Sequence, residues 1–221
     1  MKKKTVYQLI VDRSGSMQGM ENQVVSGYNE QLQVAQGIKV KYPEQEIIMG
    51  LRFFDHNVGN NVADFKPVDQ LLPISPSDYR VDGTTALLDA IGKSIYDIKT
   101  KFGYEIEQEE TTVVMIIITD GHENASRFYT FQDIHRMIRE LESTNRWSFT
   151  FMGADLDAIG ASSRFGINPE NTLSFDKADY VQVSKEYFER AADTYASNKA
   201  SNRSTSNFFS IFNDKDIRKK K

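Results

Sequence analysis

The sequence contains no cysteine, which excludes disulfides, cysteine-based zinc sites and thiol nucleophiles. It also lacks any run of 18 or more apolar residues, so we expect no membrane-spanning helix. Neither sign of charge dominates, because 27 Lys and Arg stand against 31 Asp and Glu and leave a net charge of −4. This balance gives no reason to expect a nucleic-acid partner.

The N-terminus, MKKKTVYQLIVDRSGS, begins with a basic stretch, as a secretory signal does. Its apolar part is only about six residues long, whereas the hydrophobic region of a signal peptide needs roughly 7–15. The stretch ends at Asp12 and Arg13. We therefore expect a cytoplasmic protein.

Short β-rich segments alternate with longer segments of helical periodicity. Strands are predicted at 5–12, 46–55, 60–68, 111–120, 146–155 and 171–176, and helices at 20–42, 85–102, 130–144, 156–166 and 178–199. The segment 60–68 is expected to lie antiparallel at an edge. Alternating strands and helices require parallel crossover connections. The sequence therefore predicts an α/β fold, doubly wound, with a mostly parallel central sheet of about six strands and helices on both faces.

The length of 221 residues fits one domain, expected to cover residues 1–200. Beyond it the composition becomes polar and rich in Ser and Asn, which predicts a flexible C-terminal tail over 201–221. The tail contains one apolar segment, FFSIF at 208–212. This segment either packs back on the domain or docks on a partner.

Oxygen-bearing side chains cluster at three separate places. These are VDRSGSM (11–17) after the first strand, VDGTTALLDA (81–90) before a helix, and ITDGHEN (118–124) after the strongest predicted strand. In a doubly wound sheet, ligands bind beyond the carboxyl ends of the strands. The fold is therefore expected to bring the three clusters to one edge of the sheet.

The predicted site offers two carboxylates, Asp12 and Asp120, and three hydroxyls, Ser14, Ser16 and Thr85. Oxygen ligands of this kind suit Mg²⁺, Mn²⁺ or Ca²⁺ and not zinc. Neutral hydroxyls leave much of the charge of the ion uncancelled, so the ion remains attractive to a further carboxylate. We expect the bound metal to capture an acidic side chain of a protein partner.

The stretches DRSGSM, GTTALLDAI and IIITDG together resemble the von Willebrand factor type A (VWA) domain with its metal-ion-dependent adhesion site (MIDAS). The resemblance covers about residues 4–200 and suggests a stand-alone domain of bacterial or phage type. It implies that Ser14, Ser16 and Thr85 ligate the metal directly or nearly so. It also implies that Asp12 and Asp120 act directly or through water.

The threonine turn departs from the family pattern, because Thr84 stands where a second glycine is usual. This leaves open whether Thr84 or Thr85 faces the metal. We favour Thr85, because the helix is expected to begin there; as an alternative, Thr85 would only cap that helix. His122, Glu123 and Asn124 either support the site or form a solvated loop.

Two other functions fit parts of the pattern. A haloacid dehalogenase-like Mg²⁺-dependent phosphatase would use Asp12 as its nucleophile, but it needs a second aspartate where Ser14 stands. A degenerate structural domain would bind no metal. The sequence favours an interaction module that is not an enzyme, because no nucleophile–base pair is evident.

Overall fold

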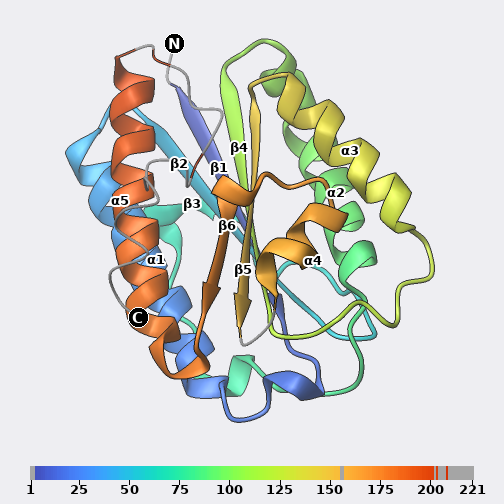
Figure 1. The fold of residues 1–221 in the computed structure, drawn as a ribbon. Helices are drawn as coiled ribbons and strands as arrows, with labels where there is room; N and C mark the ends of the chain where they lie inside the picture. The colour runs from blue at the N-terminus through green and yellow to red at the C-terminus, as the bar shows by residue number, and fades with distance from the viewer. Residues whose placement is uncertain (1–2, 155–156, 202, 204–207, 209–221) are drawn as a thin grey trace.

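The computed structural model describes residues 3–154, 157–201, 203 and 208. Within these residues six strands form one sheet in the order β3–β2–β1–β4–β5–β6 (Figure 1). Every neighbouring pair is parallel except β2 and β3. The strands are β1 Lys4–Asp12, β2 Glu46–Phe54, β3 Ala63–Pro67, β4 Thr111–Thr119, β5 Trp147–Ala154 and β6 Thr172–Phe175. The predicted sheet is confirmed, including its antiparallel edge strand.

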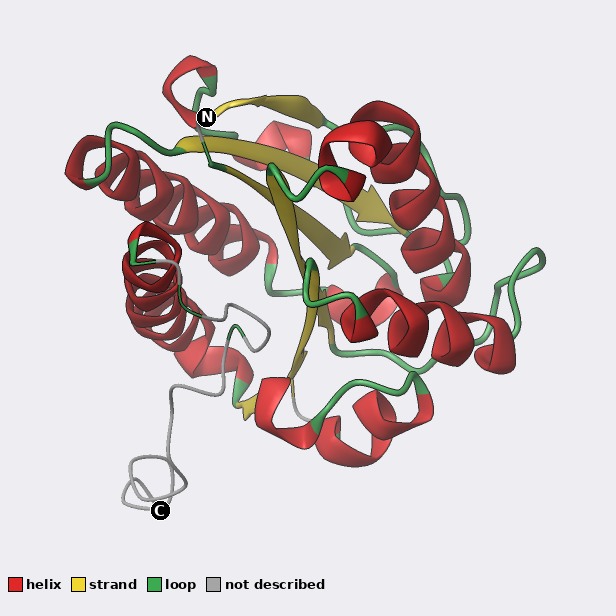
Figure 2. Ribbon diagram, turned by 90° about the horizontal axis from the view of Figure 1, so that it is seen from above, coloured by secondary structure: helices red, strands yellow, loops and turns green. Residues whose placement is uncertain are grey.

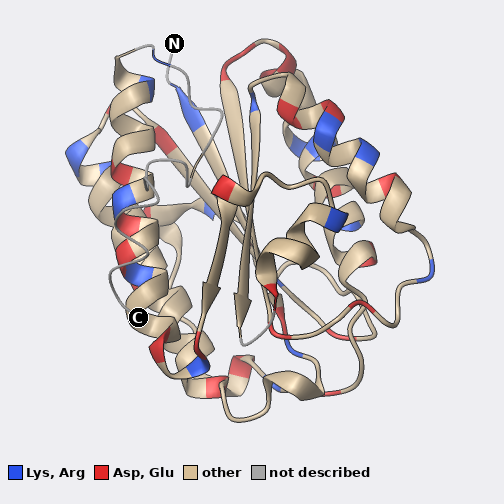
Figure 3. Cartoon of the chain, viewed as in Figure 1, with Lys and Arg blue, Asp and Glu red and all other residues tan. Residues whose placement is uncertain are grey.

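Helices cover both faces of this sheet (Figures 1 and 2). Helices α1 and α5 lie against each other on one face, and α2, α3 and α4 lie on the other. They span α1 Glu21–Lys41, α2 Leu87–Glu107, α3 Phe131–Ser143, α4 Ala158–Arg164 and α5 Tyr180–Ala200. Charged residues gather mostly on the outer faces of the helices and in the loops, while the strands are almost free of them (Figure 3). The doubly wound α/β fold is the predicted one.

The central strands are buried on both faces, as their continuous apolar runs indicate. Successive residues of β1 enter opposite cores: Leu9 and Val11 pack under α1 and α5, whereas Val6 and Ile10 pack under α2 and α3. Because side chains alternate along a strand, these two cores fix the register of β1. That register determines where Asp12, the last residue of β1, comes to lie.

Helix α3 begins with a capping box. The Thr130 hydroxyl accepts from the Asp133 amide at 3.2 Å, and the Asp133 carboxylate accepts from the Thr130 amide at 3.1 Å. Helix α2 differs from its prediction at both ends. It starts at Leu87, not at Thr85, and it continues past residue 102 to Glu107, where Ile106 is buried in the core.

The tail is described only at Ser201, Arg203 and Phe208. Phe208 is fully buried, with its ring 5.8 Å from that of Tyr7 and 5.6 Å from that of Tyr195. The rest of the FFSIF segment, 209–212, lies outside the described residues. None of the described helices has both the length and the hydrophobicity of a membrane span.

Candidate metal centre

The two central strands, β1 and β4, lie at the point where the strand order of the sheet reverses. From β1 the sheet continues to β2 on one side, and from β4 it continues to β5 on the other side. From β1 the chain passes to α1 on one face, and from β4 it passes to α3 on the other. Such a switch point leaves a crevice beyond the carboxyl ends of the two strands. Asp12 ends β1 and Asp120 follows β4, so both carboxylates lie at this crevice.

Asp12 lies at the base of the site and is fully buried. Its Oδ1 accepts from the Ser14 amide at 2.7 Å, and its Oδ2 accepts from the Thr119 hydroxyl at 2.5 Å. Burial raises the pKa of Asp12, the hydrogen bonds from Thr119 and Ser14 lower it, and the charge of Asp120 raises it further. A cation beside Asp12 would offset the cost of keeping this carboxylate charged.

The two serines of the first cluster continue the site outward. Ser14 is buried, and its Oγ lies 3.1 Å from the Oγ of Ser16. The Ser16 hydroxyl donates to Asp120 Oδ1 at 2.6 Å. A hydroxyl that donates its one proton keeps its oxygen lone pairs, so Ser16 Oγ still has the means to ligate a cation.

Thr85 lies in the loop before α2. Hydrogen bonds to the loop after β1 and to the loop after β4 hold this loop in place. Gly83 adopts a φ of +69° and its carbonyl accepts from the Gly15 amide at 2.9 Å. A Cβ at Gly83 would collide with the His56 ring. The Thr85 amide donates to Asn124 Oδ1 at 2.9 Å, and the Thr85 carbonyl accepts from the Asn124 amide at 3.1 Å. These bonds turn Thr85 toward the β4 loop.

This anchoring explains why α2 does not begin at Thr85. The first-turn amide of Leu88 donates to Glu123 Oε2 at 3.0 Å, and that of Asp89 donates to Ser126 Oγ at 3.1 Å. Side chains of the β4 loop therefore satisfy these two amides of α2, whose N-cap is Ala86, and the alternative role of Thr85 as the cap of this helix is wrong. Glu123 and Asn124 hold the loop in place, while His122 is exposed on it.

Gly121 marks the point where the three clusters meet. A Cβ placed on it would lie 3.0 Å from Thr85 Oγ1, 3.1 Å from Ser16 Oγ and 3.3 Å from Asp12 Oδ2. Thr85 is buried, whereas Thr84 is exposed. Oxygen atoms from three distant segments thus surround one small space, which is the donor chemistry that a hard divalent cation takes. No group of three or more His, Asp or Glu suited to a metal occurs among the described residues.

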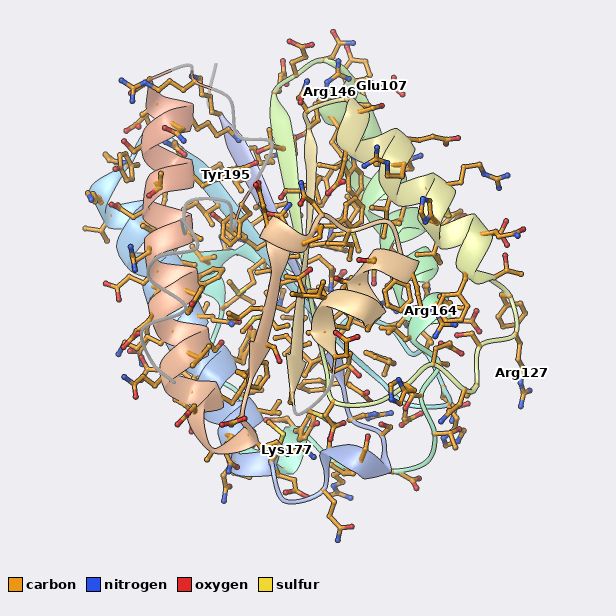
Figure 4. All side chains as sticks on the ribbon, viewed as in Figure 1. Glu107, Arg127, Arg146, Arg164, Lys177 and Tyr195 are labelled. Carbon is orange, nitrogen blue, oxygen red and sulfur yellow. The ribbon has the colours of Figure 1, made fainter. Side chains whose placement is uncertain are left out.

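Three residues of this site were not predicted from the sequence. Thr119 binds Asp12, as described above, and the Tyr79 hydroxyl donates to the Asp12 carbonyl at 2.5 Å. Lys177 lies at the lower end of the molecule, where the chain enters α5 (Figure 4). Its Nζ is 2.5 Å from Asp120 Oδ2. The one feature of the sequence that could have indicated Lys177 is its position just after β6. A residue at that position lies at the same edge of the sheet as Asp12 and Asp120.

No family model matches the sequence, and no curated protein matches it. Its structure is similar to that of proximal thread matrix protein 1 (PTMP1) from the mussel byssus, with a TM-score of 0.59 and 13% identity over 87% of this chain. The chain spans 49% of that protein. Another structure of PTMP1, with a TM-score of 0.56 and 11% identity over 86% of this chain and 46% of that one, has a zinc-occupied MIDAS motif.

Two further structures match almost over their whole length. The vWF domain of the type V pili tip protein Mfa5 from Porphyromonas gingivalis has a TM-score of 0.63 and 9% identity, over 87% of this chain and 96% of that one. The SpRpn10 VWA domain has a TM-score of 0.56 and 12% identity, over 83% and 95%. At these identities the similarity establishes the fold, and the predicted VWA-like fold is confirmed.

Proposed function

We propose that this chain is a divalent-metal-dependent protein-interaction module. Mg²⁺, or Mn²⁺ or Ca²⁺ in its place, would be held by the hydroxyls of Ser14, Ser16 and Thr85, with Asp12 and Asp120 acting directly or through water. The convergence of Thr85 Oγ1, Ser16 Oγ and Asp12 Oδ2 beside Gly121 is the observation that carries this proposal. The zinc-occupied MIDAS of PTMP1, a protein with a similar fold, supports a divalent cation at such a site but does not bear on the choice of Mg²⁺.

The charge of the site favours an acidic partner. Of the two carboxylates in the described site, Asp120 is paired with Lys177, whereas Asp12 has no cationic side chain beside it. Three neutral hydroxyls and one such carboxylate leave a divalent ion with unbalanced positive charge. We infer that a carboxylate from a protein partner completes the coordination of the metal. The metal would act as a Lewis acid that accepts this carboxylate.

The same geometry argues against a phosphatase. Asp12 is fully buried, and each of its carboxylate oxygens accepts a hydrogen bond. Ser14 occupies the position where that class of enzyme needs its second aspartate. Asp12 is therefore placed to support a cation and not to attack a phosphate, and we propose a binding function with no catalytic step.

The test combines metal binding with partner capture. Calorimetric titration with Mn²⁺ is expected to give saturable binding to the wild-type protein and none to Ser14→Ala/Ser16→Ala. Immobilised wild-type protein is then expected to retain a partner from its native lysate in Mg²⁺ but not in EDTA. Ser26→Ala/Ser163→Ala, two exposed serines on α1 and α4, is the matched control. Capture that ignores both EDTA and the site serines would contradict the proposal.

A further inference from the structure

Lys177 connects the site to the last helix. It opens a short 3₁₀ turn, Lys177–Asp179, between the end of β6 and the start of α5 at Tyr180. Its side chain reaches back across the carboxyl edge of the sheet, to the loop after β1 and the loop after β4. Nothing in the sequence motifs of the site requires a lysine at this place.

The ammonium group of Lys177 binds two residues of the site, one of them through its main chain. Its Nζ lies 2.5 Å from Asp120 Oδ2 and donates to the main-chain carbonyl of Ser16 at 3.0 Å. The Lys177 side chain is 33% exposed, whereas that of Asp120 is 2% exposed. The lysine therefore remains partly in contact with solvent while it covers a buried carboxylate.

Both oxygens of Asp120 are thus engaged. Oδ1 accepts from the Ser16 hydroxyl at 2.6 Å, and Oδ2 pairs with Lys177. The charge of Asp120 is balanced from within the chain before any metal arrives. A divalent cation beside Ser16 Oγ would meet an ammonium group bound to the same serine and to the same carboxylate, and like charges at this range repel each other.

We propose that Lys177 is an internal competitor of the metal, and that it sets the affinity of the site for divalent cations. This inference rests on the proposed function. The ammonium group occupies Asp120 in the free protein, so part of the attraction that this carboxylate offers to a metal is already used. Loading of the metal weakens the ion pair between Lys177 and Asp120, and loss of the lysine strengthens metal binding.

The first test measures metal affinity. Lys177→Met keeps the aliphatic stem and removes the charge, and it is expected to bind Mn²⁺ about tenfold more tightly than wild type, the scale of one screened unit charge at a few ångströms. Lys177→Arg keeps the charge and is expected to stay near wild type. Lys185→Met is the matched control, because Lys185 is a lysine of α5 whose ion pair with Glu30, at 2.7 Å, lies on the outer face of the helix pair.

The second test follows the lysine itself. Acetylation of Lys177 by a water-soluble reagent, measured by mass spectrometry, is expected to become faster when Mn²⁺ is added, because the amine is released from its carboxylate. The labelling rate of Lys185 is expected to stay constant. This readout does not depend on any partner.

The outcomes separate this inference from the proposed function. If Lys177→Met binds Mn²⁺ more tightly than wild type, both the competition and the proposed metal site are supported. The same holds if Lys177→Met binds Mn²⁺ and wild type does not. Equal or weaker binding by Lys177→Met overturns the competition and leaves the metal site standing, with Lys177 serving only to hold Asp120. Absence of saturable Mn²⁺ binding by wild type and by Lys177→Met, with both folded by circular dichroism, overturns both.

Discussion

The hydroxyl of Thr119, the last residue of β4, donates a 2.5 Å hydrogen bond to Oδ2 of Asp12, the last residue of β1. The Thr119 oxygen in turn accepts from the Gly121 amide at 3.0 Å. One threonine thus joins the two central strands at the switch point and also shapes the loop that carries Asp120. The position of Asp12 in the site depends on a residue that would not itself contact a metal.

Thr119→Val is expected to weaken both the fold and the site, because it leaves a buried carboxylate oxygen without its hydroxyl donor. The expected loss is about 1–3 kcal/mol in the free energy of unfolding, the range for an unsatisfied buried group. Mn²⁺ affinity is expected to fall as well, as measured by calorimetry. Thr150→Val is the control, since Thr150 is equally buried and donates to the Met115 carbonyl at 3.2 Å. It should lose stability and keep its metal affinity; parallel losses of metal affinity in the two variants would contradict this role of Thr119.

Gly121→Ala is expected to block the site without unfolding the protein. The added methyl group would lie 3.0–3.3 Å from the three converging oxygens, in the space that a cation and its ligands need. We expect a loss of Mn²⁺ affinity of about tenfold or more with a nearly unchanged circular dichroism spectrum. Gly103→Ala, in the interior of α2 with no atom near its added Cβ, should bind metal normally and gain about 0.5–1 kcal/mol of stability. Normal metal affinity of Gly121→Ala would place the metal elsewhere.

The two threonines of the α2 loop provide a matched pair. Thr85→Val removes a buried hydroxyl at the site, while Thr84→Val removes an exposed one next to it. Valine keeps the shape of threonine, so the comparison isolates the oxygen atom. We expect Thr85→Val to lower Mn²⁺ affinity and Thr84→Val to leave it unchanged. The reverse result would assign the ligand to Thr84.

Lys199, near the end of α5, predicts a pH dependence of stability at the opposite edge of the sheet. Its ammonium group donates to the carbonyl of Lys4 and to the hydroxyls of Thr5, at 3.0 Å, and Thr112, at 2.8 Å. Burial, with a smaller effect of the Lys3 charge, lowers the pKa of Lys199 to about 7. Between this pKa and that of the unfolded chain, near 10.5, the unfolded state binds more protons than the folded state.

The stability of the fold is therefore expected to rise from about pH 7 to pH 9, by up to about 1.4 kcal/mol per pH unit. Below pH 7 the lysine is protonated in both states and its contribution is constant. Urea denaturation of wild type, Lys199→Met and the exposed-lysine control Lys99→Met measures this slope. Lys199→Met should lose the slope and Lys99→Met should keep it. An unchanged slope in Lys199→Met would show that other groups cause it.

The sequence predicted the sheet well because its strongest patterns are those of buried strands. The run TTVVMIIIT of β4 allows only a strand covered on both faces, and parallel strands bring their carboxyl ends to one edge. For this reason the sequence alone predicts that Asp12 and Asp120 lie at the same edge of the sheet. The same argument applied to Ser14 and Ser16, which follow β1 directly.

The parts that the sequence did not predict depend on contacts between distant loops. The start of α2 is fixed by Glu123 and Ser126, which lie more than 30 residues away along the chain. Lys177 reaches Asp120 only through the turn between β6 and α5, and no local periodicity encodes that turn. Tyr79 comes from an irregular segment that carries no motif.

The most direct test of the metal site is a crystal structure of the protein grown with Mn²⁺, with an anomalous difference map calculated from data collected near the manganese absorption edge. The account predicts one strong peak within direct ligand distance of the Ser14, Ser16 and Thr85 hydroxyl oxygens, and a longer distance between Lys177 Nζ and Asp120 Oδ2 than the 2.5 Å seen here. A map without a peak at this edge of the sheet, from crystals in which Mn²⁺ has free access to it, would contradict the account.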